Sequence, residues 1–488
     1  MEKGGWEGFK EVIFLAESPM EEKALIRKVL EDPILFKLST LAKEKGVPFF
    51  LVGGYLRDLL LGARTPASQQ PGMDYDFALP KEFSSYISMI ENSLQFHFFK
   101  VGKEEAGTIT YRMIRKEISI DVTFFQGETL EEDLRRRDFT MNAIAVSLRD
   151  ETCHSVEGAF SDIEHGLIRS VSPRSMEQDP LRMLRAIRYL CTLAGFTMNI
   201  KLEEEILSKK ELVRKLPGER IKMELDRILL SSRPGLGMKS LHELGLLFIL
   251  MPELSGLESL GQSRHHHLDV LSHILLMIDK IPLALEGMAW NGKTISLAQE
   301  ERLTLYYAAL FHDLGKQDTY SRDEKGRVHF YHHESFSCKR AEAIMDRLRF
   351  SNPMKNRILR LIKHHMRILN LSSETGESAL KRLVNQAGED TLLLVFHTLA
   401  DKEASRGILS IQIDEIVEGH CLRILELLEE KDIVHPPPLI TGYDVMALGY
   451  SSGPKVGEIL NFIHERQVEG EIKTREEALE TLKEKFKI

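Results

Sequence analysis

The sequence predicts an α+β protein, in which a β-sheet region near the N-terminus is followed by a long helical region. Two observations carry this prediction. Residues 48–125 contain short stretches of branched and aromatic residues with alternating polarity, which is typical of strands. Further along the chain, segments such as Ala308–Leu314 are interpreted as apolar helices. At 488 residues the chain is too long for one core. Its length alone predicts about three domains.

The composition is that of a globular protein, with 43% hydrophobic and 28% charged residues. No apolar run approaches the ~20 residues that a membrane span needs. The N-terminal residues show no signal-peptide pattern. The four cysteines are scattered and are expected to be reduced thiols, which predicts a cytoplasmic protein. Because the net charge is −9, a nucleic acid is expected to meet a local basic face.

The first candidate site is a glycine turn. Pro48–Val52 predicts a short buried strand, and the apolar spacing after residue 55 predicts a helix. Between them, Gly53 and Gly54 allow the backbone to approach a ligand, and the free N–H groups at a helix start suit phosphate. Arg57, one turn into the helix, is placed to add a forked donor to the same phosphates. A turn without a ligand is the alternative.

The next predicted strand carries two acidic residues, Asp74 and Asp76. Side chains alternate along a strand, so the two carboxylates share one face. They repel each other unless a hard cation lies between them, and magnesium with triphosphate oxygens fits that position. Two surface aspartates are the simpler interpretation. The order of Gly-Gly, Arg57-Asp58 and Asp-x-Asp favours the metal site.

A third carboxylate is expected nearby. The pattern predicts three further strands, at Phe96–Val101, Gly107–Ile114 and Glu117–Phe125. In the last of these, Asp121 lies on the face opposite the apolar side chains. Asp121 is therefore placed beside the acidic pair, although a solvent-facing strand aspartate explains the pattern equally well.

These motifs resemble motif A of the class II tRNA nucleotidyltransferase and bacterial poly(A) polymerase superfamily. The resemblance implies that Asp74 and Asp76 hold the catalytic metal ions and that the Gly-Gly/Arg57 segment holds the nucleoside triphosphate. It also implies that Asp121 is the acid before a Thr-rich strand end. One departure is the longer loop Thr65–Met73, which removes no motif residue.

Arg137–Ala143 resembles motif B of the same superfamily. The resemblance implies that Asp138 contacts the ribose hydroxyls and that Arg137 and Asn142 line the nucleotide pocket. A solvated helix face is the alternative for the arginine run. Many CCA-adding relatives carry a longer flexible loop where Phe124–Thr129 joins the Asp121 strand to this segment. The short link makes addition of CC alone, with a separate A-adding partner, a serious option.

Glu177–Arg182 resembles motif D, with one departure just before the aspartate. We expect Asp179 and Arg182 to project from one side of a helix. C and A both present an amino group beside a bare ring nitrogen, which a carboxylate and a guanidinium can read. U and G leave both protein groups unpaired, at about 1–3 kcal/mol per buried group. An ordinary surface ion pair is the alternative. Arg185 and Arg188 are expected to extend a basic stripe along the nucleotide and RNA, or to form a solvated face.

The second half of the chain is rich in histidine. His312 and Asp313 lie side by side in an apolar segment, which is unfavourable unless they bind something. The pattern resembles the HD phosphohydrolase family over residues 265–405. The resemblance implies metal ligands at His273, His312, Asp313 and Asp401, with a second metal position at His333 and His365. His332 and His364 are alternatives at the two doublets, and His265–His267 is interpreted as a loop feature. Such ligands suit Mn²⁺, Ni²⁺, Fe²⁺ or Mg²⁺, and a metal there would deliver hydroxide to a phosphoester.

Together the resemblances predict a mixed-sheet nucleotidyltransferase head followed by an all-α remainder. The expected parts are an N-terminal helical extension (1–34), the head (35–170), a helical neck (171–264), an HD domain (265–410) and a tRNA-contacting tail (411–488). The expected activity is metal-dependent addition of CMP and/or AMP, from CTP or ATP, to the 3′ end of tRNA. Alternatives are a poly(A) polymerase, an HD-type phosphohydrolase with a non-catalytic RNA-binding head, and an RNA-binding scaffold. No pattern specifies a membrane partner or an oligomeric state.

Overall fold

The computed structural model describes residues 19–62, 73–102, 109–116, 118–261, 268–286, 289–290, 293–405, 411–429 and 436–486. The chain divides into two compact units, Met1–Leu216 with Glu243–Ile249, and Pro217–His242 with Leu250–Ile488. Residues 65–72 of the predicted long loop and His265–His267 lie outside the described residues. The finer division into five parts stays a prediction.

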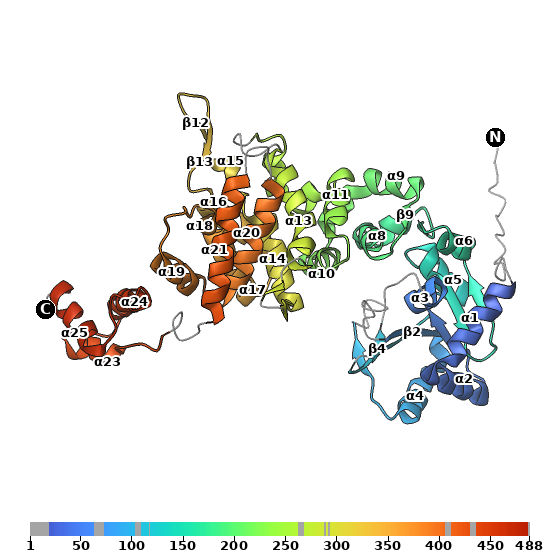
Figure 1. Ribbon diagram of the computed structural model, residues 1–488. Coiled ribbons are helices and arrows are strands. Elements are labelled where there is room, and N and C mark those ends of the chain that lie inside the picture. The colour runs from blue at the N-terminus through green and yellow to red at the C-terminus, as the bar shows by residue number, and fades with distance from the viewer. Residues whose placement is uncertain are drawn as a thin grey trace. The chain divides into compact units, whose positions relative to one another are not determined.

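A mixed seven-stranded sheet forms the centre of the first unit, in the order β3-β4-β5-β2-β1-β6-β7 (Figure 1). The pair β2 and β5 is parallel, whereas the other neighbouring pairs are antiparallel. This arrangement confirms the predicted α+β fold. The strands are β1 (Phe50–Val52), β2 (Met73–Leu79), β3 (Phe99–Val101), β4 (Thr110–Arg115), β5 (Ile118–Phe124), β6 (Ile144–Ser147) and β7 (Cys153–Ser155).

Helices surround this sheet, and a two-stranded parallel pair, β8 (Leu167–Ile168) with β9 (Thr197–Met198), lies outside it. The helices of this unit are α1 (Pro19–Glu31), α2 (Pro33–Lys45), α3 (Gly54–Leu61), α4 (Tyr86–Leu94), α5 (Leu130–Arg135), α6 (Ala159–Glu164), α7 (Ser175–Gln178), α8 (Leu181–Thr192), α9 (Ile200–Lys209) and most of α12 (Leu247–Leu250).

An aromatic core fixes the strands that carry the candidate site. The rings of Phe49 and Phe77 stack with centroids 4.6 Å apart, and Tyr86 packs edge-on against Phe49 at 5.2 Å. All three side chains are buried, and each such burial contributes about 1.5–3 kcal/mol. Asp32 caps the start of α2, accepting hydrogen bonds from two backbone N–H groups at 2.8 and 3.1 Å. Asp32 also accepts from the Tyr75 hydroxyl at 2.7 Å, which ties the start of α2 to β2 at the site.

Helices dominate the second unit, where α13 packs against α20, and α14 against α17 and α20. Two short hairpins, β10–β11 and β12–β13, depart from the predicted all-α arrangement of this part. The hairpin β12–β13 projects from the helices in Figure 1. The elements are α10 (Gly218–Leu229), α11 (Pro234–Glu243), α13 (Val270–Glu286), β10 (Ala289–Trp290), β11 (Lys293–Thr294), α14 (Gln299–Phe311), α15 (Lys316–Thr319), β12 (Tyr320–Arg322), β13 (Val328–Phe330), α16 (His333–Arg347), α17 (Asn352–His364), α18 (Met366–Leu369), α19 (Glu377–Ala387), α20 (Thr391–Ser405), α21 (Ile411–Glu429), α23 (Gly442–Ala447), α24 (Pro454–Val468) and α25 (Arg475–Lys485).

The last three helices enclose a small core of their own, which includes Ile440, Val445, Ile459 and Leu482. All four cysteines are free thiols, as the sequence predicts. None of the helices in the described part of the chain combines the length and apolarity that a bilayer crossing requires.

Candidate active site

The two acidic residues of β2 lie on one face of the sheet, as predicted. Asp74 and Asp76 are exposed, whereas Tyr75 and Phe77 between and after them are buried. The apolar side chains anchor the strand in the aromatic core, so the alternation leaves both carboxylates facing solvent from a rigid support.

Asp121 lies directly beside this pair. It is the Cα partner of Asp76 in the parallel pairing of β2 with β5, and Arg112 of β4 is its partner on the other side. The Arg112 guanidinium donates to both Asp121 oxygens, with Nε 2.7 Å from Oδ1 and Nη2 in contact with Oδ2. The structure therefore places the predicted third carboxylate in a row with Asp74 and Asp76, which we call the acidic row. In this row Asp121 is already paired with the Arg112 side chain.

The electrostatics of this row fit a divalent metal ion. Although part of Asp76 is exposed, the protein atoms packed around its carboxyl group desolvate it and raise its pKa to about 6; the carboxylates of Asp121 and Asp74 add to the rise, while the Arg137 and Arg112 guanidinium groups oppose it. Solvent still reaches Asp76, so a cation can approach. A divalent cation relieves the repulsion among these carboxylates, and the donor set of oxygens is the one that magnesium prefers.

The glycine turn closes the other side of the row. Gly53, with φ +84°, precedes α3, and a Cβ there would lie 3.2 Å from Arg137 Nη1 and 3.4 Å from Asp76 Oδ2. A Cβ on Gly54 would lie 3.4 Å from Arg57 Nη2. The predicted strand–turn–helix is present, and only glycine at residue 53 combines this backbone angle with the close approach of two charged groups.

Arg137 reaches the turn from motif B. Its Nη2 lies 3.2 Å from Asp133 Oδ2, and its buried Nε has no hydrogen-bond partner among the described residues. A Cβ on Gly53 would lie close to both Arg137 Nη1 and Asp76 Oδ2, so the Arg137 guanidinium lies near the glycine turn and near Asp76, whose pKa it lowers. This position fits its predicted place in the nucleotide pocket.

The remaining motif B residues form a buried network. Asp138 accepts hydrogen bonds from the Phe139 N–H at 2.8 Å and from Asn142 Nδ2 at 3.0 Å. Its Oδ2 lies 2.8 Å from Arg185 Nη2. Burial alone would raise the pKa of Asp138, but Arg185 and these hydrogen bonds outweigh it and hold the pKa below its usual value. Arg185 thus supplies the counter-charge that a buried carboxylate needs, and its place in a basic stripe along the nucleotide and RNA stays a prediction.

Asn142 links this network to Arg57. Arg57 Nη1 donates to Asn142 Oδ1 at 2.8 Å, and Asn142 Nδ2 donates to the Tyr189 hydroxyl at 3.1 Å. The Arg57 and Arg188 guanidinium groups lie over the Tyr189 ring, at 5.1 and 4.5 Å from its centroid. Tyr189 was not predicted from the sequence, although its position one turn after Arg185 in a helix of motif residues is a usable signal.

Motif D departs from the predicted geometry. Asp179 does not lie on a helix with Arg182: its backbone is extended (φ −145°, ψ 101°) between α7 and α8. The next residue is Pro180, and a proline disfavours helical conformation in the residue before it. Arg182 lies in the first turn of α8, where Nη1 donates to Ser175 Oγ at 2.8 Å and Nη2 donates to the Arg136 carbonyl. Arg182 thereby ties motif D to motif B.

Comparison with known proteins bears on this arrangement. A profile of the poly(A) polymerase head domain matches residues 49–169, a "Probable RNA and SrmB-binding site of polymerase A" matches 195–257, and domain 2 of tRNA nucleotidyltransferases matches 321–482. The A-adding tRNA nucleotidyltransferase of Deinococcus radiodurans is 32% identical over 88% of this chain and 93% of that protein. The CC-adding tRNA nucleotidyltransferase of Thermus thermophilus is 33% identical over 88% and 92%.

This chain belongs to the tRNA nucleotidyltransferase family. Solved structures agree on the fold of this nucleotidyltransferase. A CCA-adding enzyme in apo form I has a TM-score of 0.61 at 21% identity, covering 95% of this chain and 97% of that chain. The Thermotoga maritima CCA-adding enzyme complexed with tRNA has a TM-score of 0.57 at 20% identity, covering 95% and 98%.

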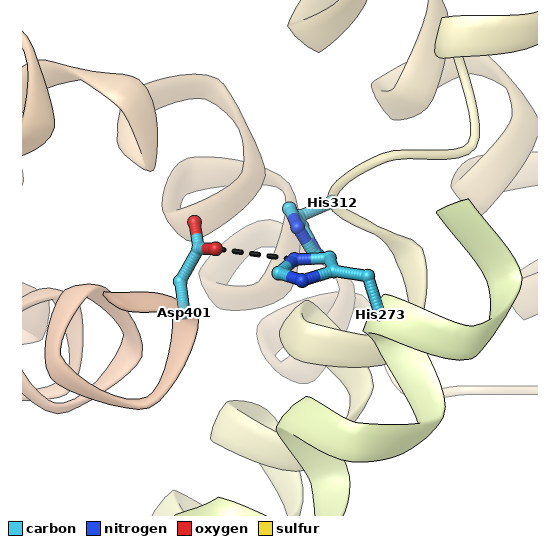
Figure 2. Close-up of side chains that lie close together, drawn as sticks. All are labelled: His273, His312 and Asp401. Atoms are coloured by element: carbon cyan, nitrogen blue, oxygen red, sulfur yellow. Dashed lines mark ion pairs between the residues drawn. The ribbon is translucent and has the colours of Figure 1, made fainter. Parts of the chain in front are cut away.

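A second cluster lies within the second unit of this nucleotidyltransferase. His273 on α13, His312 after α14 and Asp401 on α20 converge, and all three are buried (Figure 2). His273 Nε2 lies 3.1 Å from Asp401 Oδ1. Their ligand atoms lie within 4.8 Å of one another, which is a spacing that one metal ion can bridge.

A second trio adjoins the first. Asp313, His333 and His365 also bring their ligand atoms within 4.8 Å of one another. His333 Nε2 lies 3.3 Å from Asp313 Oδ1 and 3.1 Å from His365 Nε2. His312 Nε2 lies 3.2 Å from Asp313 Oδ2, so Asp313 touches both trios. Every residue predicted from the HD resemblance is therefore at this centre, while the assignment to that family stays a prediction.

Backbone carbonyls orient the histidine rings. The Nδ1–H groups of His312, His333 and His365 donate to the carbonyls of Ala309, Phe330 and Ile362 at 2.8, 2.9 and 2.6 Å. In this tautomer the Nε2 lone pairs face the centre, as metal ligation requires. Burial and the neighbouring His312 and His333 hold the pKa of His365 well below its usual value, so His365 stays neutral. Of the two doublets, His332 is exposed and His364 belongs to neither trio.

Two further residues at the histidine centre were not predicted from the sequence. Lys316 Nζ lies 2.7 Å from Asp313 Oδ2, and with His312 it holds the pKa of Asp313 well below its usual value despite burial. His397 packs against the rings of His312 and His365, with centroids 5.2 and 5.9 Å apart. A histidine in an apolar helix one turn before Asp401 was the available signal.

Proposed function

We propose that the first unit transfers CMP and/or AMP from CTP or ATP to the 3′ end of a tRNA. The observation that carries this proposal is the row of Asp74, Asp76 and Asp121 beside the Gly53 turn. Family membership supports it, as do the printed names of the relatives, which are A-adding and CC-adding tRNA nucleotidyltransferases. These substrates and the absence of a bilayer-crossing helix in the described residues suit a cytoplasmic enzyme.

Asp74 and Asp76 would hold magnesium ions against the triphosphate, since added positive charge would offset the repulsion from Asp74 and Asp121 that helps to raise the pKa of Asp76. When bound, magnesium lowers the pKa of the attacking 3′ hydroxyl and neutralises the triphosphate. The chain itself positions the nucleotide. Free N–H groups at the start of α3 bind phosphate, and Arg137 supplies a guanidinium beside them.

The motif B network forms the wall of the nucleotide pocket. Asp138 and Asn142 are fixed by Arg185, Arg57 and Tyr189, so they meet a ribose without reorganising. We assign base selection to Asp179 and Arg182. Since Arg182 bridges to the Arg136 carbonyl, a bound C or A would exchange that contact for its ring nitrogen.

The test uses tRNA transcripts that end at the discriminator base, at C, or at CC, each incubated with labelled CTP or ATP and magnesium. A CC-adding enzyme extends the first two with C only, an A-adding enzyme extends only the third, and a CCA-adding enzyme extends all three. Extension of oligo(A) without any extension of tRNA would instead identify a poly(A) polymerase. Failure to extend every RNA would overturn the proposal.

The histidine centre supports a second activity, hydrolysis of phosphoesters. Two adjacent buried trios, joined by the contact of Asp313 with His312, are a specific observation in its favour. They suit Mn²⁺, Ni²⁺, Fe²⁺ or Mg²⁺, and a bound ion would supply hydroxide at neutral pH. A phosphodiesterase assay with manganese or nickel on the wild type and on His312→Ala tests this assignment. Equal hydrolysis by both proteins would exclude it.

A further inference from the structure

Arg112 is a basic side chain beside the acidic row that the proposed mechanism leaves without a role. Arg112, Asp121 and Asp76 are consecutive Cα partners across β4, β5 and β2. Residues paired in this way point to the same face of a sheet. Because β1 lies on the far side of β2, Arg112 lies at the end of the row away from Gly53.

The contact between Arg112 and Asp121 is a fork. Nε lies 2.7 Å from Oδ1 and Nη2 contacts Oδ2, so both oxygens of Asp121 are bound to the guanidinium. The Asp121 side chain is 17% exposed, whereas that of Arg112 is 39% exposed. A guanidinium has more N–H donors than this fork uses, and Arg112 can present the remaining ones to a ligand.

The order of the strands indicates which ligand that is. In phosphoryl transfer the attacking and leaving oxygens lie on opposite sides of the phosphorus. The proposed function places the triphosphate at Gly53 and Gly54, after β1. The attacking RNA end must then approach from the side of β5 and β4. We propose that Arg112, held by Asp121, binds the terminal phosphodiester of the RNA acceptor, and that Asp121 is a positioning residue and not a metal ligand.

Two measurements on Arg112→Ala test this inference, which rests on the proposed function. The first is the Kd for tRNA without nucleotide or metal, which we expect to rise about tenfold, with a salt dependence weaker by about one phosphate contact. The second compares KM values at saturating magnesium. The KM for tRNA should rise with the Kd, whereas the KM for CTP and ATP should change by less than about twofold. Arg112→Lys should restore part of the loss, since it keeps the charge but not the fork.

Asp121→Asn separates a positioning residue from a metal ligand. If Asp121 only holds Arg112, Asp121→Asn should reproduce the phenotype of Arg112→Ala, and the double variant should be no worse than either single one. A loss of kcat of more than about 100-fold at saturating tRNA, with a higher magnesium requirement, would identify a metal ligand and overturn the inference. An unchanged tRNA Kd in Arg112→Ala would overturn it too.

Arg115→Ala is the matched control. Arg115 lies on the same strand but on the opposite face from Arg112, with its guanidinium 4.3 Å from the centroid of the Phe96 ring. The Arg115→Ala substitution removes the same charge as Arg112→Ala and should leave tRNA binding unchanged. Should the wild type extend no RNA, the proposed function fails, while the nucleotide-free Kd still reports on Arg112 separately.

Discussion

The two candidate centres each bring several charged or ionisable side chains together, but they differ in how far those side chains are exposed to solvent. In the first unit, Asp74 and Asp76 are exposed to solvent, and guanidinium groups such as Arg112 and Arg137 lie around them. In the second unit the six ligand candidates are all buried, and Lys316 is the cation that contacts them among the described residues.

This difference has a consequence for what each centre binds. An open acidic row flanked by arginines suits a ligand that brings phosphates, because the arginines bind the anion and the carboxylates bind its metal ions. A closed set of histidine nitrogens and carboxylates suits metal ions that stay resident. We therefore expect the first centre to bind its metal ions together with its substrate. We expect the stability of the second unit to depend on its resident metal.

The largest expected effect is loss of nucleotide addition in Asp76→Ala. Removing one of two carboxylates that hold the metal ions forfeits several kcal/mol of transition-state stabilisation, which is about 1,000-fold or more in kcat. Incorporation of labelled CTP and ATP into tRNA measures it. Phosphodiesterase activity should be unchanged in the same preparation. Retention of full transfer activity would contradict the role of the acidic row.

The next effect is loss of bound metal from the second unit in Asp313→Ala. Asp313 contacts both trios, so its removal should leave little manganese on the protein after gel filtration, measured by elemental analysis. The thermal unfolding midpoint should also fall, since a resident metal stabilises the folded state. Asp323→Ala, at an exposed turn where Asp323 pairs with Arg327 at 2.7 Å, is the control and should keep its metal. Unchanged metal content in Asp313→Ala would refute the assignment of Asp313 as a metal ligand.

A smaller effect concerns pH and the motif B network. Asp138 has a pKa below its usual value, so its contribution to stability is fully present above the unfolded pKa of about 3.9 and is lost as pH falls through the folded value. Asp138→Asn should destabilise the protein at pH 7 by about 2–4 kcal/mol, because Arg185 loses its buried partner. Urea unfolding at pH 7 and near pH 3 should show this difference shrinking with acidity. A difference independent of pH would show that the charge of Asp138 is not what stabilises the network.

The smallest effect is expected for Tyr189→Phe. The substitution removes the hydroxyl that accepts from Asn142 at 3.1 Å but keeps the ring beneath Arg57 and Arg188. One hydrogen bond is worth about 1 kcal/mol, so kcat/KM for nucleotide addition should fall about fivefold. Tyr189→Ala, which also removes the ring, should lose clearly more. Equal losses would show that the ring contributes nothing.

Local patterns in the sequence predicted the backbone of the first site well. The strand–turn–helix at Gly53, the shared face of Asp74 and Asp76, and the position of Asp121 all follow from strand alternation and glycine geometry, which need no distant partner. Contacts between distant segments were not predictable in this way. Arg112 meets Asp121 only because β4 and β5 pair in one register.

The errors have specific physical causes. Asp179 was expected on a helix, but Pro180 forces it into extended backbone. The pairing of Arg185 with the buried Asp138 was not foreseen either, because it depends on how two distant segments pack. At the histidine centre the predicted ligands came together, whereas Lys316 and His397 were overlooked because a single lysine or histidine carries no pattern until the helices pack.

The most direct test of the central claim is a crystal structure with CTP or ATP and manganese in place of magnesium. We predict an anomalous peak that contacts both Asp74 and Asp76, with the triphosphate at Gly53 and Gly54 and with Asp121 still bound to Arg112. A nucleotide bound elsewhere, or a peak that leaves either β2 aspartate without metal contact, would contradict the account.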